Sequence, residues 1–261
     1  MKTRIVVALI MIPIVLLPIF LGWIWSVALF LLVALIASHE FATLLAAGGY
    51  KTIPWFGYAW VAGLVLSAWQ PELLPLSTVL TVGLILAFTI VLFQPEQPLQ
   101  RWLATVAPSI YLGVMISQAL ALRLLPDGLM WLMFAILITW ANDTVAYFSG
   151  VTLGKRPLWP RLSPKKTWEG TVGGWLGAAA VGALLAGLMP ITISPLIGAA
   201  LGLIGGVLAL FGDLTISLVK RQVGAKDSGA MFPGHGGMLD RLDSILFVVP
   251  FIYQVVLVFR L

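Results

Sequence analysis

The polar residues best placed to do chemistry lie in one stretch, from Phe211 to Ser244. It contains aspartates, lysines, arginines, a histidine and several glycines, and it separates two apolar runs, although charged residues make up only 10% of the chain. Charged groups at membrane depth are costly, and they usually face the interior of a helix bundle or a water-filled cavity. The stretch is therefore predicted to be a functional site.

The first part of this stretch continues the preceding apolar run as a helix. At about 100° per residue, one narrow sector contains three glycines and three polar residues, namely Gly198, Gly202, Gly206, Asp213, Ser217 and Lys220. The glycines would let a neighbouring backbone approach closely, while the same face presents a carboxylate, a hydroxyl and an ammonium group. A packing face whose last turns reach the lipid headgroups would account for Lys220 and Arg221, but not for the deeper Asp213.

Beyond Arg221 the helical periodicity ends, and closely spaced glycines with Pro233 predict a loop. Glycines let a backbone come close to a ligand, and Lys226 and His235 could reach anionic oxygens, so a phosphate-binding loop fits. Turns are also rich in glycine for steric reasons alone. The chain then resumes with an acidic pair, of which Asp243 is the better candidate to cap the last helix.

A second polar cluster lies between Thr139 and Gly170. Thr139, Asp143 and Tyr147 recur at every fourth residue and share a helix face, with Asn142 alongside. An isolated aspartate in a span can be a hydrogen-bond acceptor between helices, but beside a second cluster of this kind a functional role is favoured.

The loop after this helix is basic. It contains Lys155, Arg156 and Arg161, and then Lys165 and Lys166. Such residues could bind anionic lipid headgroups, at about 1 kcal/mol each near the surface, or the phosphate of a substrate. Within this loop, the dipeptide Ser163–Pro164 predicts the start of the next helix.

Both clusters resemble the phosphatidate cytidylyltransferases, also called CDP-diacylglycerol synthases. The matching residues of the later run are Ser217, Lys220, Arg221, Lys226, Asp227, His235, Gly236, Gly237, Asp240, Arg241 and Asp243. The earlier run matches in its Asn142–Asp143 pair, a Gly154–Lys155 step and the segment from Ser163 to Gly170. The resemblance covers about the C-terminal half, and the first half matches only as hydrophobic spans.

The resemblance implies an enzyme that joins phosphatidate to CTP, giving CDP-diacylglycerol and pyrophosphate for phospholipid synthesis. It also suggests a homodimer in a bacterial inner membrane. The attacking phosphate oxygen is already an oxyanion near neutral pH, so the main obstacle is repulsion between two polyanions. Divalent cations with fixed lysines and arginines would screen that charge and align the groups.

Oxygen ligands such as aspartate and serine suit Mg²⁺, while the absence of cysteine and the presence of only two histidines argue against zinc. We expect Asp213 and Asp240, with Ser217 assisting, to hold Mg²⁺, and Asp143 and Asp243 to be secondary ligands. A second, monovalent cation is compatible with this site.

The remaining roles follow the same scheme. The catalytic set comprises Asp213, Asp240, Lys220, Arg221, Lys226 and Arg241. The substrate-binding set comprises Asn142, Asp143, Lys165, Lys166, Ser217, His235, Gly236 and Gly237. His235 could serve only to order its loop.

Membrane helices must hold these side chains in place. A hydrophobic content of 61% and a mean hydropathy of +1.05 predict an all-α polytopic integral membrane protein and exclude a soluble domain. Apolar ranges near the roughly 20 residues that a bilayer requires predict about nine transmembrane helices, at residues 5–23, 24–46, 55–70, 75–93, 102–124, 127–149, 171–190, 194–221 and 242–260. Range 55–70 is short enough to be partly re-entrant, and the first range has no convincing signal-peptide cleavage site, so we expect it to be retained.

Residues 1–126 are predicted to serve packing and dimer contacts. Residues 127–261 are predicted to form the catalytic region, with a polar cavity open to the cytoplasm and cytoplasmic loops at 150–170 and 221–241. With nine spans and a cytoplasmic N-terminus, all Lys and Arg residues except Arg123 and Arg260 lie inside, as the positive-inside rule requires. This topology places the active site in the cytoplasm and the C-terminus outside.

Two polar residues of the first half need less explanation. His39 and Glu40 fall near the cytoplasmic end of the second range, where an interfacial helix end tolerates both, and Glu40 is a minor candidate for lining the cavity. The net charge of +5 does not imply nucleic-acid binding, because the basic residues lie in short loops between apolar runs.

Two other functions fit parts of this pattern. Another CTP-dependent lipid enzyme, such as a polyprenol kinase, would transfer the γ-phosphoryl group and release CDP. A cation transporter would also use intramembrane aspartates and small-residue faces, but it predicts an inverted repeat, and the polar groups here are concentrated in one half.

Overall fold

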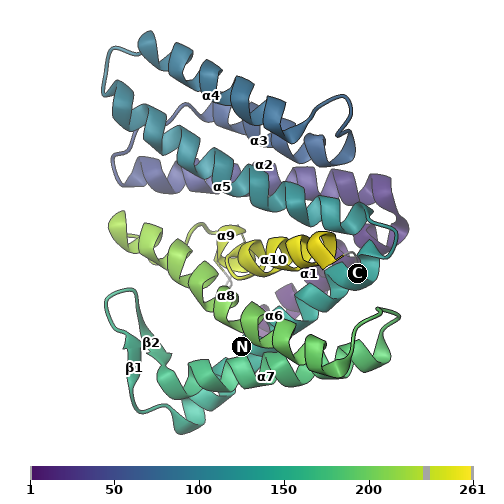
Figure 1. Cartoon of the computed structure of the whole chain (residues 1–261). Coiled ribbons are helices and arrows are strands. Elements are labelled where there is room, and N and C mark those ends of the chain that lie inside the picture. Colours follow the sequence, from purple (N-terminus) through teal and green to yellow (C-terminus); the bar gives the residue numbers. More distant parts are fainter. Residues whose placement is uncertain (1, 232–235, 260–261) are drawn as a thin grey trace. The chain divides into compact units, whose positions relative to one another are not determined.

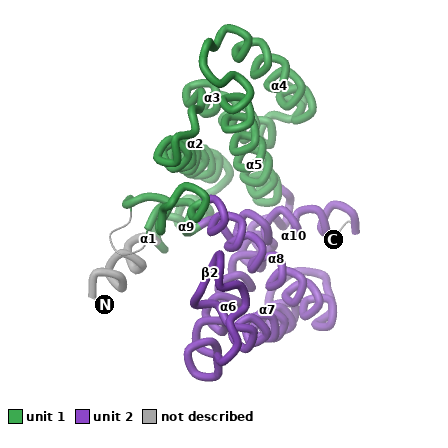
Figure 2. The backbone as a smooth tube through the Cα atoms, turned by 90° about the vertical axis from the view of Figure 1, so that its left-hand side faces the viewer, with its two compact units in different colours: residues 1–124, 220–241 green, residues 125–219, 242–261 purple. Residues whose placement is uncertain are grey.

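The computed structural model describes the backbone of residues 2–231 and 236–259, and almost all of it is α-helical (Figure 1). The chain divides into two compact units (Figure 2). The first unit comprises Met1–Leu124 and Lys220–Arg241, and the second comprises Leu125–Val219 and Leu242–Leu261. The loop of the signature-like run therefore packs with the first half of the chain.

The first unit is built mainly from helices that pack side by side. They are α1 (Lys2–Leu21), α2 (Trp23–Ala47), α3 (Pro54–Trp69), α4 (Leu76–Leu92), α5 (Pro98–Leu124) and the short α9 (Leu239–Leu242). Helices α2, α3 and α5 contact one another, and α4 covers α3 and α5. Pro54 opens α3, where its missing N–H costs nothing, and the N–H of Ile53 is bound by the Thr105 hydroxyl of α5 at 2.9 Å.

The second unit is also helical but includes a small hairpin. Its elements are α6 (Gly128–Leu153), β1 (Pro157–Trp159), β2 (Ser163–Thr167), α7 (Trp168–Leu188), α10 (Ile245–Phe259) and α8 (Pro195–Gln222) as far as Val219. Strands β1 and β2 are antiparallel, with Pro157 opposite Thr167 and Trp159 opposite Ser163. The hairpin joins α6 to α7, so it holds the basic loop at one end of this helix pair.

The predicted helix start at Ser163 and Pro164 is wrong. Both residues lie in β2, and α7 begins five residues later at Trp168. Thr167 is the N-cap, because its hydroxyl accepts the N–H of Gly170 at 3.2 Å. Glu169, in the first turn of α7, accepts the N–H groups of Lys155 and Arg156, which ties the start of the hairpin to the helix.

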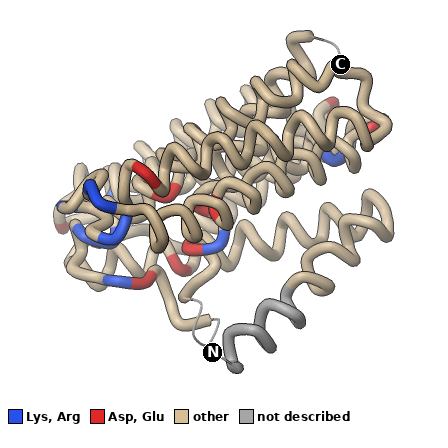
Figure 3. Tube along the Cα trace, turned by 90° about the horizontal axis from the view of Figure 1, so that it is seen from below, with Lys and Arg blue, Asp and Glu red and all other residues tan. Residues whose placement is uncertain are grey.

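The helical ranges agree more closely with prediction. Each predicted apolar range coincides with a helix of the structure to within a few residues at most of its ends. Within the described residues, five helices are long and apolar enough to cross a membrane, namely α2, α5, α6, α7 and α8. The chain is thus an all-α integral membrane protein, and the number of helices that cross the bilayer stays a prediction. Figure 3 shows how few positions along the chain are charged.

Helices α7 and α8 pack with their backbones in near contact. A Cβ atom added at Gly202 would lie 2.1 Å from the carbonyl oxygen of Ala178, and one at Gly198 would lie 2.4 Å from that of Gly182. The close approach predicted for the glycine face of α8 is therefore present, with α7 as the partner. Gly170 and Gly174 of α7 serve α6 in the same way, since Cβ atoms there would lie 2.8 Å from the carbonyl oxygen of Ala146 and 2.9 Å from that of Asn142.

We expect Gly202→Ala to destabilise the protein, because the new methyl group has backbone rather than a movable side chain to meet. Overpacking of this kind costs about 1–3 kcal/mol, which exceeds the gain of roughly 0.5–1 kcal/mol from replacing a helical glycine. The measurement is the thermal midpoint of the detergent-solubilised protein.

Gly187→Ala is the matched control on α7, because a Cβ there meets nothing within 4 Å. It should leave the midpoint unchanged or raise it slightly. Equal midpoints for the two variants would contradict the proposed backbone contact.

Candidate functional site

A cavity of about 410 Å³ lies within the second unit, between α6, β2, α7 and α8. Its polar lining comprises Asn142, Asp143, Tyr147, Lys165, Lys166, Thr167, Thr171 and Asp213. The volume is in the range of small-molecule sites. The indole nitrogen of Trp175, another lining residue, is buried and has no hydrogen-bond partner in the described part of the chain, so a ligand could satisfy it.

Asp213 of α8 is the best-defined acidic group of this cavity. Its Oδ2 lies 2.5 Å from the ammonium group of Lys166 on β2, and its Oδ1 accepts the hydroxyl of Ser217, one helical turn away, at 3.1 Å. The side chains of Lys166 and Asp213 are 27% and 31% exposed. An exposed ion pair contributes little to stability, so a ligand can separate these two groups at small cost.

Asn142 and Asp143 place a second polar pair at the cavity from α6. The amide of Asn142 donates to Oδ1 of Asp143 at 3.1 Å. Asn142 is buried where the three helices meet, and a Cβ at either Gly174 or Gly206 would lie 2.9 Å from its side-chain oxygen. The glycines of α7 and α8 thus make room for an amide that orients the neighbouring carboxylate.

Asp243 lies in the turn between α9 and α10. Its Oδ1 accepts the N–H of Ser244, directly before α10, and a Cβ at Gly212 of α8 would collide with its backbone. Its charged neighbours include the carboxylates of Asp213 and Asp143 and the ammonium group of Lys166. Three carboxylates of the second unit and the ammonium group of Lys166 therefore lie within electrostatic reach of one another.

This donor set fits a magnesium ion. Carboxylate, hydroxyl and amide oxygens are the ligands that Mg²⁺ prefers, and mutual repulsion among Asp143, Asp213 and Asp243 is what a divalent cation would relieve. Among the described residues, no three or more acidic, histidine or cysteine side chains are arranged to hold a metal ion. That is consistent with the usual Mg²⁺ site of one or two carboxylates completed by substrate phosphates and water.

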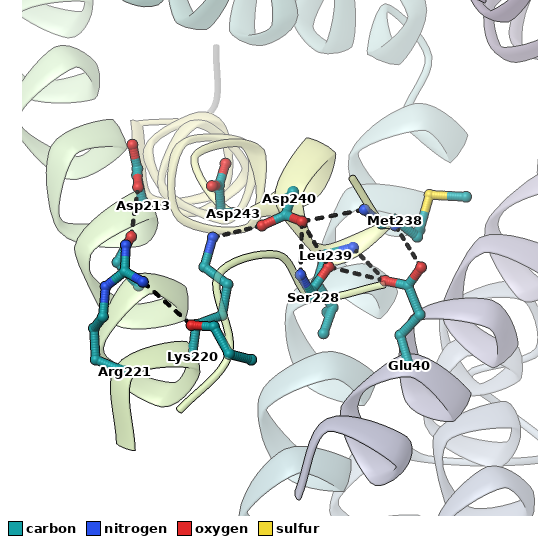
Figure 4. A network of polar contacts seen from close by, with 12 residues as sticks. Glu40, Asp213, Lys220, Arg221, Ser228, Met238, Leu239, Asp240 and Asp243 are labelled. Carbon is teal, nitrogen blue, oxygen red and sulfur yellow. Dashed lines mark hydrogen bonds and ion pairs between the residues drawn. The ribbon is translucent and has the colours of Figure 1, made fainter. Parts of the chain in front are cut away.

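Three other sequence-predicted residues, Lys220, Gly237 and Asp240, belong to a polar network in the first unit (Figure 4). Lys220, at the end of α8, donates to Oδ1 of Asp240 at 2.5 Å, and both side chains are 11% exposed. Oδ2 of Asp240 accepts the N–H groups of Ser228 at 2.8 Å and Gly237 at 3.1 Å. Asp240 therefore closes the loop that begins after α8, in addition to any role as a metal ligand, which stays a prediction.

Glu40 of α2 takes part in the same network, which the sequence did not indicate. It is only 8% exposed, and its carboxylate accepts the N–H groups of Met238 at 2.8 Å and Leu239 at 3.0 Å. The Ser228 hydroxyl lies 3.2 Å from Oε2 of Glu40 and 3.0 Å from Oδ2 of Asp240, so its one proton is shared between two carboxylates. In the sequence, His39 and Glu40 are two adjacent polar residues near a helix end. That pattern does not distinguish a carboxylate that binds a loop from one that lies at the membrane interface.

The remaining predicted residues are more exposed. Arg221, Lys226 and Arg241 lie at the surface, and the guanidinium group of Arg221 donates to the carbonyl oxygen of Ala225. Gly236 has a φ of 80°, and a Cβ there would lie 2.5 Å from Oδ2 of Asp240, so only glycine fits. His235 lies outside the described residues.

The predicted site is thus divided between the two units. The second unit brings together Asn142, Asp143, Lys165, Lys166 and Asp213, with Ser217 beside Asp213. The first unit brings together Lys220, Gly237 and Asp240.

Comparisons with known proteins extend the resemblance to the whole chain. A model described as the cytidylyltransferase family matches residues 2–259. The chain is 34% identical over 260 residues to the phosphatidate cytidylyltransferase of Brucella abortus, a match that covers 97% of this chain and 92% of that protein. The phosphatidate cytidylyltransferase of Bacillus subtilis is 40% identical over 152 residues, or 58% of this chain and 56% of that protein. That of Synechocystis sp. is 45% identical over 131 residues, or 50% of this chain and 44% of that protein.

The Asp240 network predicts a pH dependence of stability. Burial alone would raise the pKa of Asp240, but the ion pair with Lys220 and the N–H groups of Ser228 and Gly237 outweigh it and hold the pKa below its usual 3.8. A carboxyl whose pKa is lower in the folded state stabilises the protein above 3.8 and loses that contribution as the pH falls through the folded-state pKa.

Asp240→Asn should therefore lower the thermal midpoint near neutral pH, and the difference from wild type should shrink as the pH falls below 3.8. Asp227→Asn, an exposed change in the same loop, is the control and should leave the midpoint unchanged across this range. A difference for Asp240→Asn that stays constant down to low pH would contradict the proposed ion pair.

Proposed function

Because this chain belongs to the cytidylyltransferase family, we infer that it transfers the cytidylyl group of CTP to phosphatidate, giving CDP-diacylglycerol and pyrophosphate. The observation that carries this inference is similarity over 97% of the chain to a phosphatidate cytidylyltransferase. The enzyme is a nucleotidyltransferase of phospholipid synthesis, and CTP and phosphatidate are its substrates.

The reaction forms one phosphorus–oxygen bond and breaks another. A phosphate oxygen of phosphatidate attacks the α-phosphorus of CTP, and the bond from that phosphorus to the bridging oxygen of the β-phosphate breaks. Pyrophosphate leaves with the electron pair. The nucleophile is already ionised near neutral pH, so the protein does not need a strong base.

The cavity of the second unit is lined by basic side chains that can bind phosphate and by acidic side chains that can hold a metal ion, and the proposed reaction requires both. Lys165 and Lys166 project from β2 to its lining, where they neutralise phosphate oxygens, and Thr167 supplies a hydroxyl. We assign Mg²⁺ to Asp213, with Ser217 beside it and either Asp143 or Asp243 as a second carboxylate donor. When bound, Mg²⁺ supplies positive charge to the triphosphate oxygens.

The basic residues that the sequence analysis assigned to the site and that lie in the first unit are of two kinds. Lys220 is buried against Asp240, so we assign its charge first to holding the loop in place and only second to binding a substrate. Arg221, Lys226 and Arg241 are exposed, and we assign them to phosphate or lipid headgroup binding. A second, monovalent cation beside Mg²⁺ remains part of the proposal without a residue assigned to it.

The location of the enzyme follows from its substrates. Phosphatidate is a membrane lipid and CTP is a cytoplasmic nucleotide, so the catalytic side must face the cytoplasm. We place the protein in a bacterial inner membrane, in line with the bacterial relatives, with its N-terminus inside and its C-terminus outside. We also propose that it acts as a homodimer and does not bind nucleic acid.

The first test is direct. Detergent-purified protein incubated with α-labelled CTP, phosphatidate and Mg²⁺ should move the label into the organic phase and release one pyrophosphate for each lipid product. Omitting phosphatidate or chelating Mg²⁺ should abolish the transfer. Release of CDP and phosphorylation of a polyprenol would instead identify a lipid kinase, and ion flux in liposomes without nucleotide would identify a transporter.

The second test concerns the metal assignment. Asp213→Asn keeps the size of the side chain and the bond to Ser217 but removes the charge, so kcat should fall at least about a hundredfold, as for removal of one key charge-stabilising group. Asp127→Asn is the matched control, because Asp127 is an exposed aspartate of the same unit whose side chain makes no capping bond. Wild-type turnover by well-folded Asp213→Asn would remove Asp213 from the proposed site.

A further inference from the structure

We propose that Glu40, on a helix of the first half of the chain, is a positioning residue that fixes the conformation of the described parts of the loop between α8 and α9, residues 223–231 and 236–238. The loop carries Lys226, Gly236 and Gly237, all of which are assigned above to the proposed reaction, so this inference rests on that function. Glu40 does not touch substrate in this scheme, and it acts through the backbone of the loop.

The first argument is that Glu40 is buried and forms no ion pair with any residue that the structure describes. It lies on the apolar helix α2 and is 8% exposed. A buried carboxylate is costly unless hydrogen bonds compensate it. Its compensation comes from the loop, because both of its oxygens accept hydrogen bonds from residues 228, 238 and 239. An interfacial helix end would have left this carboxylate in water.

The second argument is steric. A Cβ added at Gly237 would lie 2.4 Å from Oε2 of Glu40, and one added at Gly229 would lie 2.7 Å from Oε1. Real Cβ atoms essentially never come so close to another heavy atom. Any side chain at Gly229 or Gly237 would therefore collide with the Glu40 carboxylate. The loop packs against this carboxylate so closely that only glycine is possible at both positions.

The third argument is that Glu40 and Asp240 work as a pair. Asp240 accepts the N–H groups of Ser228 and Gly237, and Glu40 accepts those of Met238 and Leu239 (Figure 4). Four backbone N–H groups from the two ends of one glycine-rich segment are thus bound by two acceptors. The Ser228 hydroxyl lies between the two carboxylates, and Lys220 provides an ammonium group at Asp240. Each carboxylate closes the segment from a different part of the chain.

The chemistry of the side chain determines the test. Glu40→Gln keeps the shape of the side chain but replaces one acceptor oxygen with an NH₂ group. One of the two N–H groups of Met238 and Leu239 would then face a donor. Glu40→Asp keeps both acceptors but withdraws them by one methylene group, so it should restore part of what the glutamine variant loses.

The experiment uses the full-length protein in detergent and two readouts. The first is the rate of tryptic cleavage after Lys226, which follows the population of loop-open molecules and requires no substrate. The second is kcat/KM for CTP per folded molecule. We expect Glu40→Gln to raise the cleavage rate roughly tenfold and to lower kcat/KM only as far as the closed, competent fraction falls, with Glu40→Asp intermediate in both and with little change in the thermal midpoint.

Glu96→Gln is the matched control. Glu96 is an exposed glutamate of the same unit, paired with Lys51 in a different loop, and its amide variant loses an ion pair without touching the loop of Glu40. It should equal wild type in both readouts. Wild-type cleavage and wild-type kcat/KM in folded Glu40→Gln would overturn the proposal, even if its thermal midpoint were lower.

A second set of variants keeps the test decisive if Glu40→Gln folds poorly. Gly229→Ala places a methyl group against the Glu40 carboxylate, so it should accelerate tryptic cleavage in the wild-type background and have little further effect beside Glu40→Ala, where the carboxylate is gone. Additive effects of the two changes would exclude the contact. The tryptic readout also separates the two proposals, because failure of wild type to form CDP-diacylglycerol would refute the function and leave the loop contact to be judged by cleavage.

Discussion

The structure depends on the cost of holding charged and hydrogen-bonding groups away from water. In the first unit this cost is met by mutual satisfaction. Asp240 and Glu40 accept N–H groups of the loop between α8 and α9, and Lys220 neutralises Asp240. Any of these groups left alone would be an uncompensated buried charge or an unpaired N–H group. The loop conformation is therefore specified by two carboxylates rather than by the packing of apolar side chains.

The second unit treats its charges differently. Asp213 and Lys166 form an ion pair that water reaches, at the edge of a cavity large enough for a ligand, and the carboxylates of Asp143 and Asp243 lie within electrostatic reach of it. The hydrogen-bonded carboxylates of the first unit maintain the conformation of the loop. The water-accessible ion pair of the second unit is available to bind a ligand. The glycine faces of α7 and α8 support this arrangement, because they bring the helices close enough for Asn142 to be buried beside Asp143.

Much of this could be predicted from the sequence, because it depends on local pattern. The apolar ranges specify helices, glycines at every fourth residue of α8 predict its close neighbour, and aspartates in apolar surroundings mark the cavity. The hairpin could not be predicted in this way. Ser163 and Pro164 are typical of a helix start, but in the structure they belong to β2, which pairs with β1, and Thr167 caps the helix instead. The role of Glu40 was equally hidden, because its partners lie 188 to 199 residues away in the sequence and most of them are backbone N–H groups without a side-chain signature.

The ion pair of Lys166 with Asp213 has a further consequence for what the cavity admits. In the resting protein each partner is the other's counter-ion, so a lone anion that draws away the ammonium group exposes the carboxylate, and a lone cation that takes the carboxylate exposes the ammonium group. A ligand that carries an anionic and a cationic part together exchanges both at once and leaves no charge uncompensated. The resting pair is thus matched in charge to a ligand of this kind, as the metal-complexed nucleotide proposed above would be.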